Sequence, residues 1–251
     1  MTDPAGSSTV RAHPTPSHAN EALRSYGGEQ GDIRVARRRA SLIEAALELL
    51  GSSDGGTISV RGVCREAGLT GRYFYESFTT IDDLVSATFD QVIAEISASA
   101  LDGFARGTNV GAKVTGAVGA IVDVIDADRR KGRLLFSPSL LSPTVAAKRL
   151  ESTELFAGLT LQSAGGVLDV VTGSADALAT AHYQVGGFAR VLAAWLDGGL
   201  ELDRDGVVAV SVRIMTTVAD SLEATSNPRT AKPQNPAGPG GVDGAERRSL
   251  A

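Results

Sequence analysis

A long series of helical patterns runs along this 251-residue chain and constrains its fold more than any other feature. Apolar residues recur every three to four positions, as on one face of an α-helix. Glycines or cap-forming side chains separate one series from the next, and no stretch alternates as a strand would. We therefore expect an all-α fold of about nine helices, over residues 34–51, 59–67, 71–77, 80–105, 109–128, 131–137, 142–163, 174–196 and 203–224.

The two ends of the chain differ in composition from the helical part. Residues 1–32 and 226–251 are rich in Ser, Thr, Pro, Gly and Ala. They carry too few apolar side chains to offset the entropy that ordering would cost. We expect two disordered tails that flank a smaller domain over residues 33–80 and a larger helical domain over residues 81–225.

Scarce aromatic residues are concentrated in one segment, LTGRYFYESF, residues 69–78. The chain has seven Phe, four Tyr and one Trp, and four of these twelve residues lie in this segment. Phe74 and Phe78 are four residues apart, so they share one helix face and can anchor the segment on helix 34–51. Tyr73 and Tyr75 lie to either side of that face.

Two short helices that meet at a glycine, braced by a third, make a helix-turn-helix. In such a unit the second helix enters the DNA major groove and contacts base edges and backbone. Arg72 could then reach a phosphate or a guanine edge. The alternative is that the four aromatic residues form only a local core, with two tyrosines at its edge.

The net charge also differs between the predicted helix-turn-helix and the rest of the chain. From Arg34 to Arg72 there are seven Arg against four acidic residues, a net charge of +3. From Ile81 to Thr225 there are 11 basic and 18 acidic residues, a net charge of −7. A basic front and an acidic rear suggest an anionic partner at the front.

Three segments, ARRRASLIEAALELLG, TISVRGVCREAGLTGRYFYESF and TTIDDLVSATFDQV, resemble the DNA-binding domain of the TetR (tetracycline-repressor-like) family of transcription regulators. The likeness covers residues 36–94 and includes the A-G-x-[ST] turn at Ala67 to Thr70, followed by Tyr75, Phe78 and Leu84 at the family's spacing. The later segment RRKGRLLFSPSLLSPTVAAKR is similar to the connection between the middle helices of many members.

The resemblance implies a homodimer, usually a repressor, whose two heads bind a palindromic operator in double-stranded DNA. It also implies that a small molecule in the larger domain releases the DNA. The DNA-binding residues that it implies, in the turn, the short helices and the basic arm at Arg34–Arg39, are Arg37, Ser59, Arg61, Thr70, Gly71, Arg72, Tyr73 and Tyr75.

The sequence departs from the family's pattern at two positions. Ile81 stands where many members have a Lys that contacts phosphate, and Ser77 stands where many have His or Tyr. The arginine arm or the amide groups of the helix that starts near Thr80 could replace the missing contact.

Candidate ligand contacts lie in the larger domain. His182 is the first choice for a polar contact because it lies beside an apolar stripe. The other candidates are the aromatic residues Tyr183, Phe136, Phe188, Trp195 and Phe104, together with Phe156. The alternative for each is ordinary core packing, or solvent contact for His182. Because the candidate walls are apolar with one His and the domain is acidic, we expect a mainly hydrophobic effector that is neutral or cationic.

The dimer interface is expected in the last two long helices, which bring together small and apolar residues. The first has Gly186, Gly187, Ala189, Ala193 and Ala194, and the second has Val207, Val210, Ile214, Met215 and Val218. Pairing this hairpin with its copy would make a four-helix bundle.

Several other classes of protein are disfavoured. A single cysteine, Cys64, excludes an internal disulfide and is expected to be buried. We find no secretory signal and no membrane-spanning run, so a cytoplasmic protein is expected. No catalytic motif, metal-ligand cluster or cofactor motif is present. The basic run Arg129–Arg133 is interpreted as a solvated surface or as charge that complements a helix C-terminus. The alternatives to a ligand-responsive regulator are a DNA-binding dimer without an effector and a helical enzyme.

Overall fold

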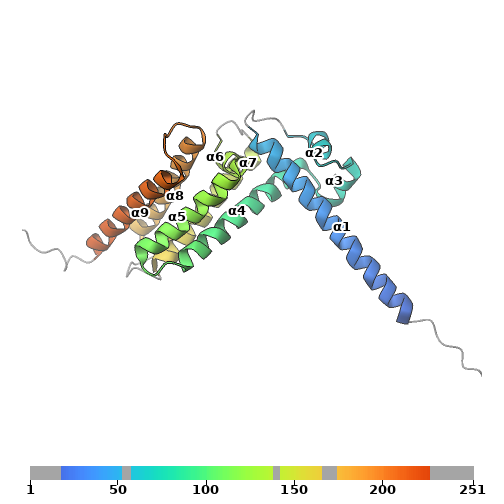
Figure 1. The fold of residues 1–251 in the computed structure, drawn as a ribbon, viewed down its shortest axis with the longest axis horizontal. Coiled ribbons are helices and arrows are strands. Elements are labelled where there is room, and N and C mark those ends of the chain that lie inside the picture. Colours follow the sequence, from blue (N-terminus) through green and yellow to red (C-terminus); the bar gives the residue numbers. More distant parts are fainter. Residues whose placement is uncertain (1–17, 53–57, 138–141, 166–173, 227–251) are drawn as a thin grey trace, which may run out of the picture.

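The computed structural model describes the chain outside residues 1–17, 53–57, 138–141, 166–173 and 227–251 (Figure 1). Its described residues form nine helices and no strand, which confirms the expected all-α fold. The helices are α1 (His18–Gly51), α2 (Val60–Glu66), α3 (Gly71–Ser77), α4 (Ile81–Ala105), α5 (Val110–Ala127), α6 (Arg129–Phe136), α7 (Pro143–Gly165), α8 (Ala175–Leu196) and α9 (Arg204–Ser226).

Helix α1 begins earlier than the sequence analysis expected. It starts at His18 rather than near residue 34, so that prediction of the helix start is wrong. Glu21, Ala22, Leu23 and Arg24 all have high helix propensity, and extending an existing helix costs far less than nucleating one. Residues 1–17 and 227–251 of the expected tails lie outside the described residues, and the domain limits stay a prediction.

Helices α1, α2 and α3 form the head at one end of the molecule (Figure 1). Ser59 caps α2 by accepting a hydrogen bond from the backbone N–H of Gly62 at 3.2 Å. Gly68 turns the chain into α3 with a φ of 65°, which a glycine adopts without strain. The head core consists of Leu42, Ile43, Ala45, Ala46, Val63, Cys64, Phe74, Phe78 and Leu84. Cys64 is therefore buried as predicted, and burial raises the pKa of its thiol.

Helices α4 to α9 form the rear domain, in which α4, α5, α8 and α9 run alongside one another (Figure 1). Its core includes Phe89, Val122, Ile125, Leu134 and Leu192. Helix α5 lies against both α4 and α9, and α7 lies against α4 and α8. No helix within the described ranges has the length and apolar character needed to span a membrane.

Helix α6 joins the rear domain to the head. The guanidinium of Arg130 is 2.9 Å from Glu44 and 2.7 Å from Glu48, both on α1, and 2.7 Å from Asp128 at its own helix start. The hydrogen bond from Arg130 lowers the pKa of Asp128, and the hydrogen bond to Asp128 contributes most to raising the pKa of Arg130.

The neighbouring basic residues of α6 are also engaged. Lys131 Nζ is 2.6 Å from Glu95 on α4, and Arg133 donates to the carbonyl of Gly51 at 3.3 Å. The interpretation of Arg129–Arg133 as a solvated surface is therefore wrong for three of its residues. Their charges are satisfied between helices, a pairing of distant segments that a local charge run does not indicate.

Candidate functional site

The outer face of α3 is strongly exposed. The side chain of Arg72 is 84 % exposed and Tyr75 is 65 % exposed, and Thr70 and Gly71 beside them are also exposed. Phe74, between the two tyrosines, is fully buried. The expected division between anchoring and outward residues is therefore seen in the structure.

Two arginines on neighbouring helices converge on Glu76 of α3. Arg38 of α1 is 3.1 Å from one carboxylate oxygen and Arg72 is 3.3 Å from the other. The guanidinium of Arg38 also lies over the ring of Tyr73, 4.4 Å from its centre. Tyr73 is consequently half-buried and held against α1, whereas Tyr75 is free to face outward.

The remaining predicted DNA contacts lie around the same surface. Arg37 on α1 and Arg61 on α2 are exposed, and Ser59 occupies the start of α2. Thr70 is the N-cap of α3, and its side chain makes no cap hydrogen bond. A Cβ at Gly71 would meet nothing within 4 Å, so the fold leaves this position open to close approach.

The start of α4 is a poor replacement for the missing lysine. Thr80 and Asp83 form a capping box, in which the backbone N–H of each residue donates to the other's side chain at 2.9 and 3.1 Å. Two of the amides are thus already engaged, and Asp82 and Asp83 add negative charge beside Ile81. Of the two candidate replacements, the geometry favours the arginines of α1.

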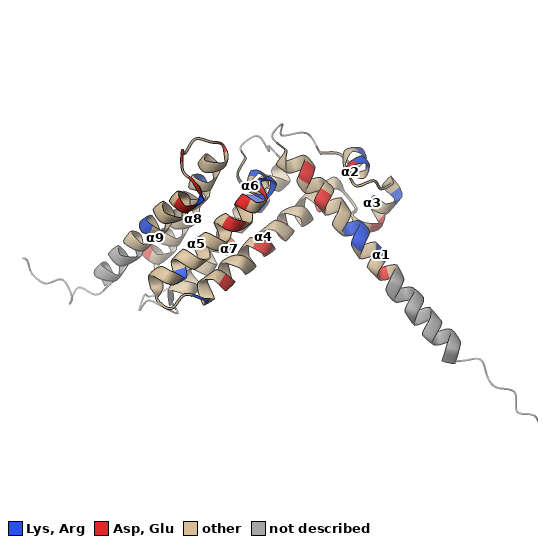
Figure 2. Ribbon diagram, viewed as in Figure 1, with Lys and Arg blue, Asp and Glu red and all other residues tan. Residues whose placement is uncertain are grey.

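Figure 2 shows that the charged residues in the described part of α1 are grouped by sign. Basic residues gather where α1 passes α3, and acidic residues follow toward the rear domain. The acidic pair Glu44 and Glu48 is held by Arg130 rather than turned to the head's outer face. The basic residues in the middle of α1 therefore lie beside α3.

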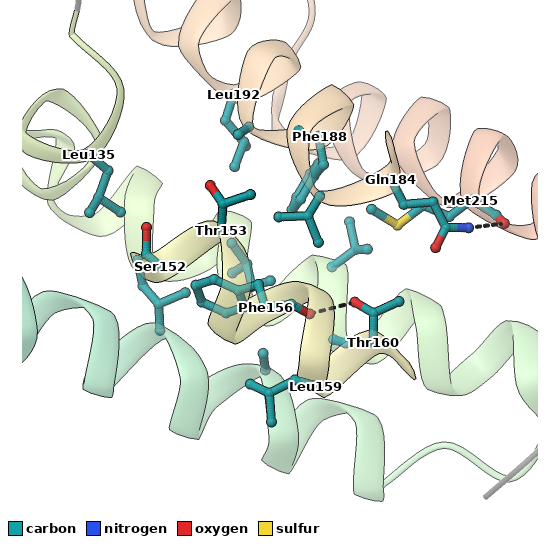
Figure 3. A pocket seen from close by; sticks show the side chains of 18 of the residues that line it. Leu135, Ser152, Thr153, Phe156, Leu159, Thr160, Gln184, Phe188, Leu192 and Met215 are labelled. Atoms are coloured by element: carbon teal, nitrogen blue, oxygen red, sulfur yellow. Dashed lines mark hydrogen bonds between the residues drawn. The ribbon is translucent and has the colours of Figure 1, made fainter. Parts of the chain in front are cut away.

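The rear domain has a cavity of about 500 Å³, partly open to solvent, between α4, α5, α6, α7, α8 and α9. Figure 3 shows Phe156 of α7 and Phe188 of α8 extending toward the same space, with Leu159, Leu192 and Met215 around them. Most of its lining is aliphatic or aromatic, and this volume lies in the range of small-molecule sites.

One face of α7 brings polar side chains to this cavity. Arg149, Ser152, Thr153, Thr160 and Ser163 all line it. Thr160 donates to the carbonyl of Phe156 at 2.8 Å, as Figure 3 shows. Across the cavity, Gln184 Nε2 donates to the carbonyl of Met215 at 3.1 Å. The wall is thus apolar with a few fixed polar groups, as binding sites commonly are.

The sequence and the fold were compared with those of known proteins. No known family profile matches the sequence, and no curated protein matches it. A TetR-family transcriptional regulator from Syntrophomonas wolfei superimposes with a TM-score of 0.62 at 12 % identity, covering 74 % of this chain and 96 % of the other. A TetR-family regulator from Streptomyces coelicolor gives 0.57 at 20 % identity, covering 76 % and 83 %. The regulator FadR from Bacillus subtilis, in complex with stearoyl-CoA, gives 0.54 at 13 % identity, covering 71 % and 96 %.

The chain has the fold of TetR-family transcription regulators. The resemblance noted in residues 36–94 therefore extends, at the level of the fold, to α4–α9, where the sequence itself is poorly diagnostic. Enzymes are not among these neighbours, each of which is named as a transcription regulator.

Within this TetR-type fold, the predicted ligand contacts divide into two groups. Phe104, Phe136 and Phe188, with Phe156, line the cavity. His182, Tyr183 and Trp195 do not. Tyr183 is 71 % exposed, and His182 Nε2 is 3.6 Å from Glu154 on α7. Trp195 is buried, and its Nε1 donates to the carbonyl of Leu202 at 2.9 Å, so it is a core residue.

The polar side chains at the cavity thus come mainly from α7, whereas His182 of α8 lies outside its lining. His182 and Phe188 are six residues apart, so they point to different sides of α8. The residues that the sequence analysis missed follow a readable pattern: Arg149, Thr153, Phe156, Thr160 and Ser163 are spaced by four, three, four and three. That spacing places them on one helix face and could have identified it.

Proposed function

We propose that this protein is a homodimeric DNA-binding transcription regulator, a repressor that a small molecule releases from a palindromic operator. One observation carries the proposal: an exposed, basic helix-turn-helix and a large apolar cavity occur in the same chain, joined by the ion pairs of α6. The fold shared with TetR-family regulators supports it.

DNA recognition is assigned to α3 and its surroundings. Arg72 has the exposure to reach guanine or phosphate, and Tyr75 has the exposure to pack on the backbone or base edges. Thr70, Gly71 and Tyr73 complete the contact face, while Ser59, Arg61 and Arg37 contact phosphates on either side. Acidic residues pair with arginine here, so DNA must compete with Glu76 for Arg72.

Two heads are needed because one seven-residue helix offers few contacts. We assign the dimer interface to the outer faces of α8 and α9, where Gly187 is exposed and Ile214 is 46 % exposed. The expected interface changes in detail, because Ala193 and Val207 are buried within their own subunit. Met215 lines the cavity and is likewise directed inward.

The effector is assigned to the cavity, and we propose a mainly hydrophobic small molecule. The apolar lining favours such a ligand, and a protein of this fold has been solved with stearoyl-CoA, which carries a long acyl chain. An effector-free regulator would have no need of a cavity this large. The described residues hold no group of three or more His, Cys, Asp or Glu placed for a metal.

The experiment begins by selecting bound duplexes from a random DNA pool with the full chain. We expect an enriched palindrome whose half-site centres are about 34–36 Å apart, or a multiple of that spacing. Sedimentation should give a dimer, and Gly187→Arg with Ile214→Glu should give a folded monomer that no longer shifts the palindrome.

Leu150→Glu is the matched control, because Leu150 is 65 % exposed on α7, away from the assigned interface. This variant should stay dimeric and bind DNA normally. Enrichment of no sequence, or a double variant that remains a dimer and binds the palindrome as the parent does, would contradict the proposal.

A further inference from the structure

The charged residues that line the cavity have one sign. Among the described residues of the wall, Arg149 on α7 and Arg190 on α8 are the charged members, and neither Asp nor Glu belongs to the lining. The surrounding domain is acidic overall, with 18 acidic residues against 11 basic ones. The cavity thus differs in charge from the domain that encloses it.

Arg149 is incompletely satisfied by the protein. Its Nη2 donates to the carbonyls of Leu134 and Ser137 at the end of α6, at 3.1 and 2.7 Å. Its Nε is buried and has no hydrogen-bond partner among the described residues. Burial lowers the pKa of the guanidinium, but an arginine side chain keeps its positive charge in proteins. A buried N–H donor such as this Nε is costly unless an acceptor reaches it.

Other polar groups beside Arg149 do not supply that acceptor. The hydroxyls of Ser152 and Thr153 both donate to the carbonyl of Arg149 itself, each at 2.9 Å. In the described part of the chain, no carboxylate forms an ion pair with its guanidinium, whereas neighbouring Lys148 pairs with both Asp90 and Glu151. Lys148 is thus neutralised by carboxylates outside the cavity, whereas Arg149 lines the cavity without a carboxylate partner.

We propose that the cavity takes an amphiphile with an apolar body and a carboxylate, and that Arg149 binds the carboxylate while Phe156 and Phe188 contact the body. The proposal rests on the proposed function in that it treats the cavity as the effector site. It reverses the charge expected from the acidity of the domain, because the wall residues rather than the average charge face the ligand. A hydrogen bond between two charged groups is among the strongest available in such a site.

The test compares three probes of one chain length below their micelle concentrations: decanoate, methyl decanoate and decyltrimethylammonium. Binding to the full chain is measured by calorimetry. We expect decanoate to bind at least about tenfold more tightly than methyl decanoate. Decyltrimethylammonium should bind more weakly than either, because its charge faces arginine. Arg149→Met should remove the preference for decanoate and leave methyl decanoate binding within about threefold.

Lys148→Met is the matched control, since it removes the same charge one residue away on a side chain outside the cavity wall. It should keep the full preference for decanoate. If Arg149→Met does not fold, as judged by circular dichroism, Arg149→Lys replaces it, and this variant should lower decanoate affinity more than methyl decanoate affinity. A role of Arg149 that is only structural would lower both affinities alike.

Equal binding of decanoate and methyl decanoate, or an unchanged preference in the Arg149 variant, would overturn the carboxylate assignment while leaving an apolar effector site in place. Binding of none of the three probes would overturn it as well. The DNA selection described above reports on the proposed function independently, because it uses no ligand.

Discussion

The head and the rear domain differ in how completely their side chains fill the interior. In the head, Phe74 is fully buried and Phe78 is 6 % exposed in a small core made by three helices and the start of α4. In the rear domain, six helices leave a cavity of about 500 Å³ between aromatic and aliphatic side chains. The head has a filled core and candidate functional residues on its surface, whereas the candidate functional residues of the rear domain line its cavity.

This difference explains which residues can carry function in each region. On a seven-residue helix such as α3, every position either anchors or faces outward, so the contact residues are close together in sequence. Cavity residues come from α4 to α9 and are recognisable as neighbours only after folding. The two regions are joined by the ion pairs of Arg130 and by apolar packing, because Leu47 and Leu50 of α1 belong to the rear-domain core.

The largest loss of stability should come from truncating a large side chain in the core of the head. Phe74→Ala should lower the free energy of unfolding by about 3–5 kcal/mol, because a well-packed core cannot close over the space. Phe188→Ala is the matched change in the rear domain and should cost clearly less, since Phe188 is half-buried and borders an existing cavity. Chemical denaturation measures both. Equal losses would mean that the two interiors are packed alike.

Removing the exposed arginine of α3 should separate DNA binding from stability. Arg72→Ala should weaken binding to the selected palindrome by about 1–3 kcal/mol, while binding to random duplex falls much less. Arg106→Ala, at the far end of α4, removes another exposed arginine with an i,i+4 partner and should change neither. Fluorescence anisotropy at fixed salt gives both affinities. Equal losses on the two DNAs would make Arg72 only a phosphate contact.

Removing the ion pairs of Arg130 should lower the free energy of unfolding by a smaller amount, and this loss should depend on pH. Arg130→Met should lower the free energy of unfolding by about 1 kcal/mol at neutral pH, because it leaves Asp128, Glu44 and Glu48 unpaired. The pKa of Asp128 is lowered in the folded state, so its contribution is complete above the ordinary carboxyl value of about 4 and is lost as pH falls through the lowered value.

Denaturation of parent and variant between neutral and acid pH tests this assignment. The difference between the two proteins should shrink as the pH falls below about 4. A difference that stays constant across this range would show that Arg130 acts through packing rather than through its carboxylate partners.

The smallest effect is expected at Glu76, which touches both arginines of the contact surface. Glu76→Gln removes a negative charge near the DNA and releases Arg72 and Arg38, at a cost to stability within about 1 kcal/mol. Binding to random duplex should strengthen by a few fold, and the ratio of specific to random affinity should fall. A variant with an unchanged ratio would mean that Glu76 does not position Arg72.

The head could be predicted in detail because its determinants are local. The buried faces of Phe74 and Phe78 and the exposed faces of Arg72 and Tyr75 follow from helical spacing, and the turn follows from Gly68. The start of α1 was misjudged, because Pro- and Ser-rich residues before it masked the helix formers that follow. In the rear domain the helices were predictable, but the inward side of α8 was not. His182 faces Glu154 of α7 at the surface. Trp195 belongs to the core, where its Nε1 donates to the carbonyl of Leu202.

The central claim is that the packed head and the hollow rear domain are coupled, so that filling the cavity changes DNA binding. The most direct measurement is the affinity for the selected palindrome with and without saturating decanoate, together with the affinity for decanoate with and without the palindrome. We predict that each ligand weakens the other by the same factor, at least about fivefold, as reciprocal linkage requires. Decanoate that binds the cavity and leaves operator affinity unchanged would contradict the account.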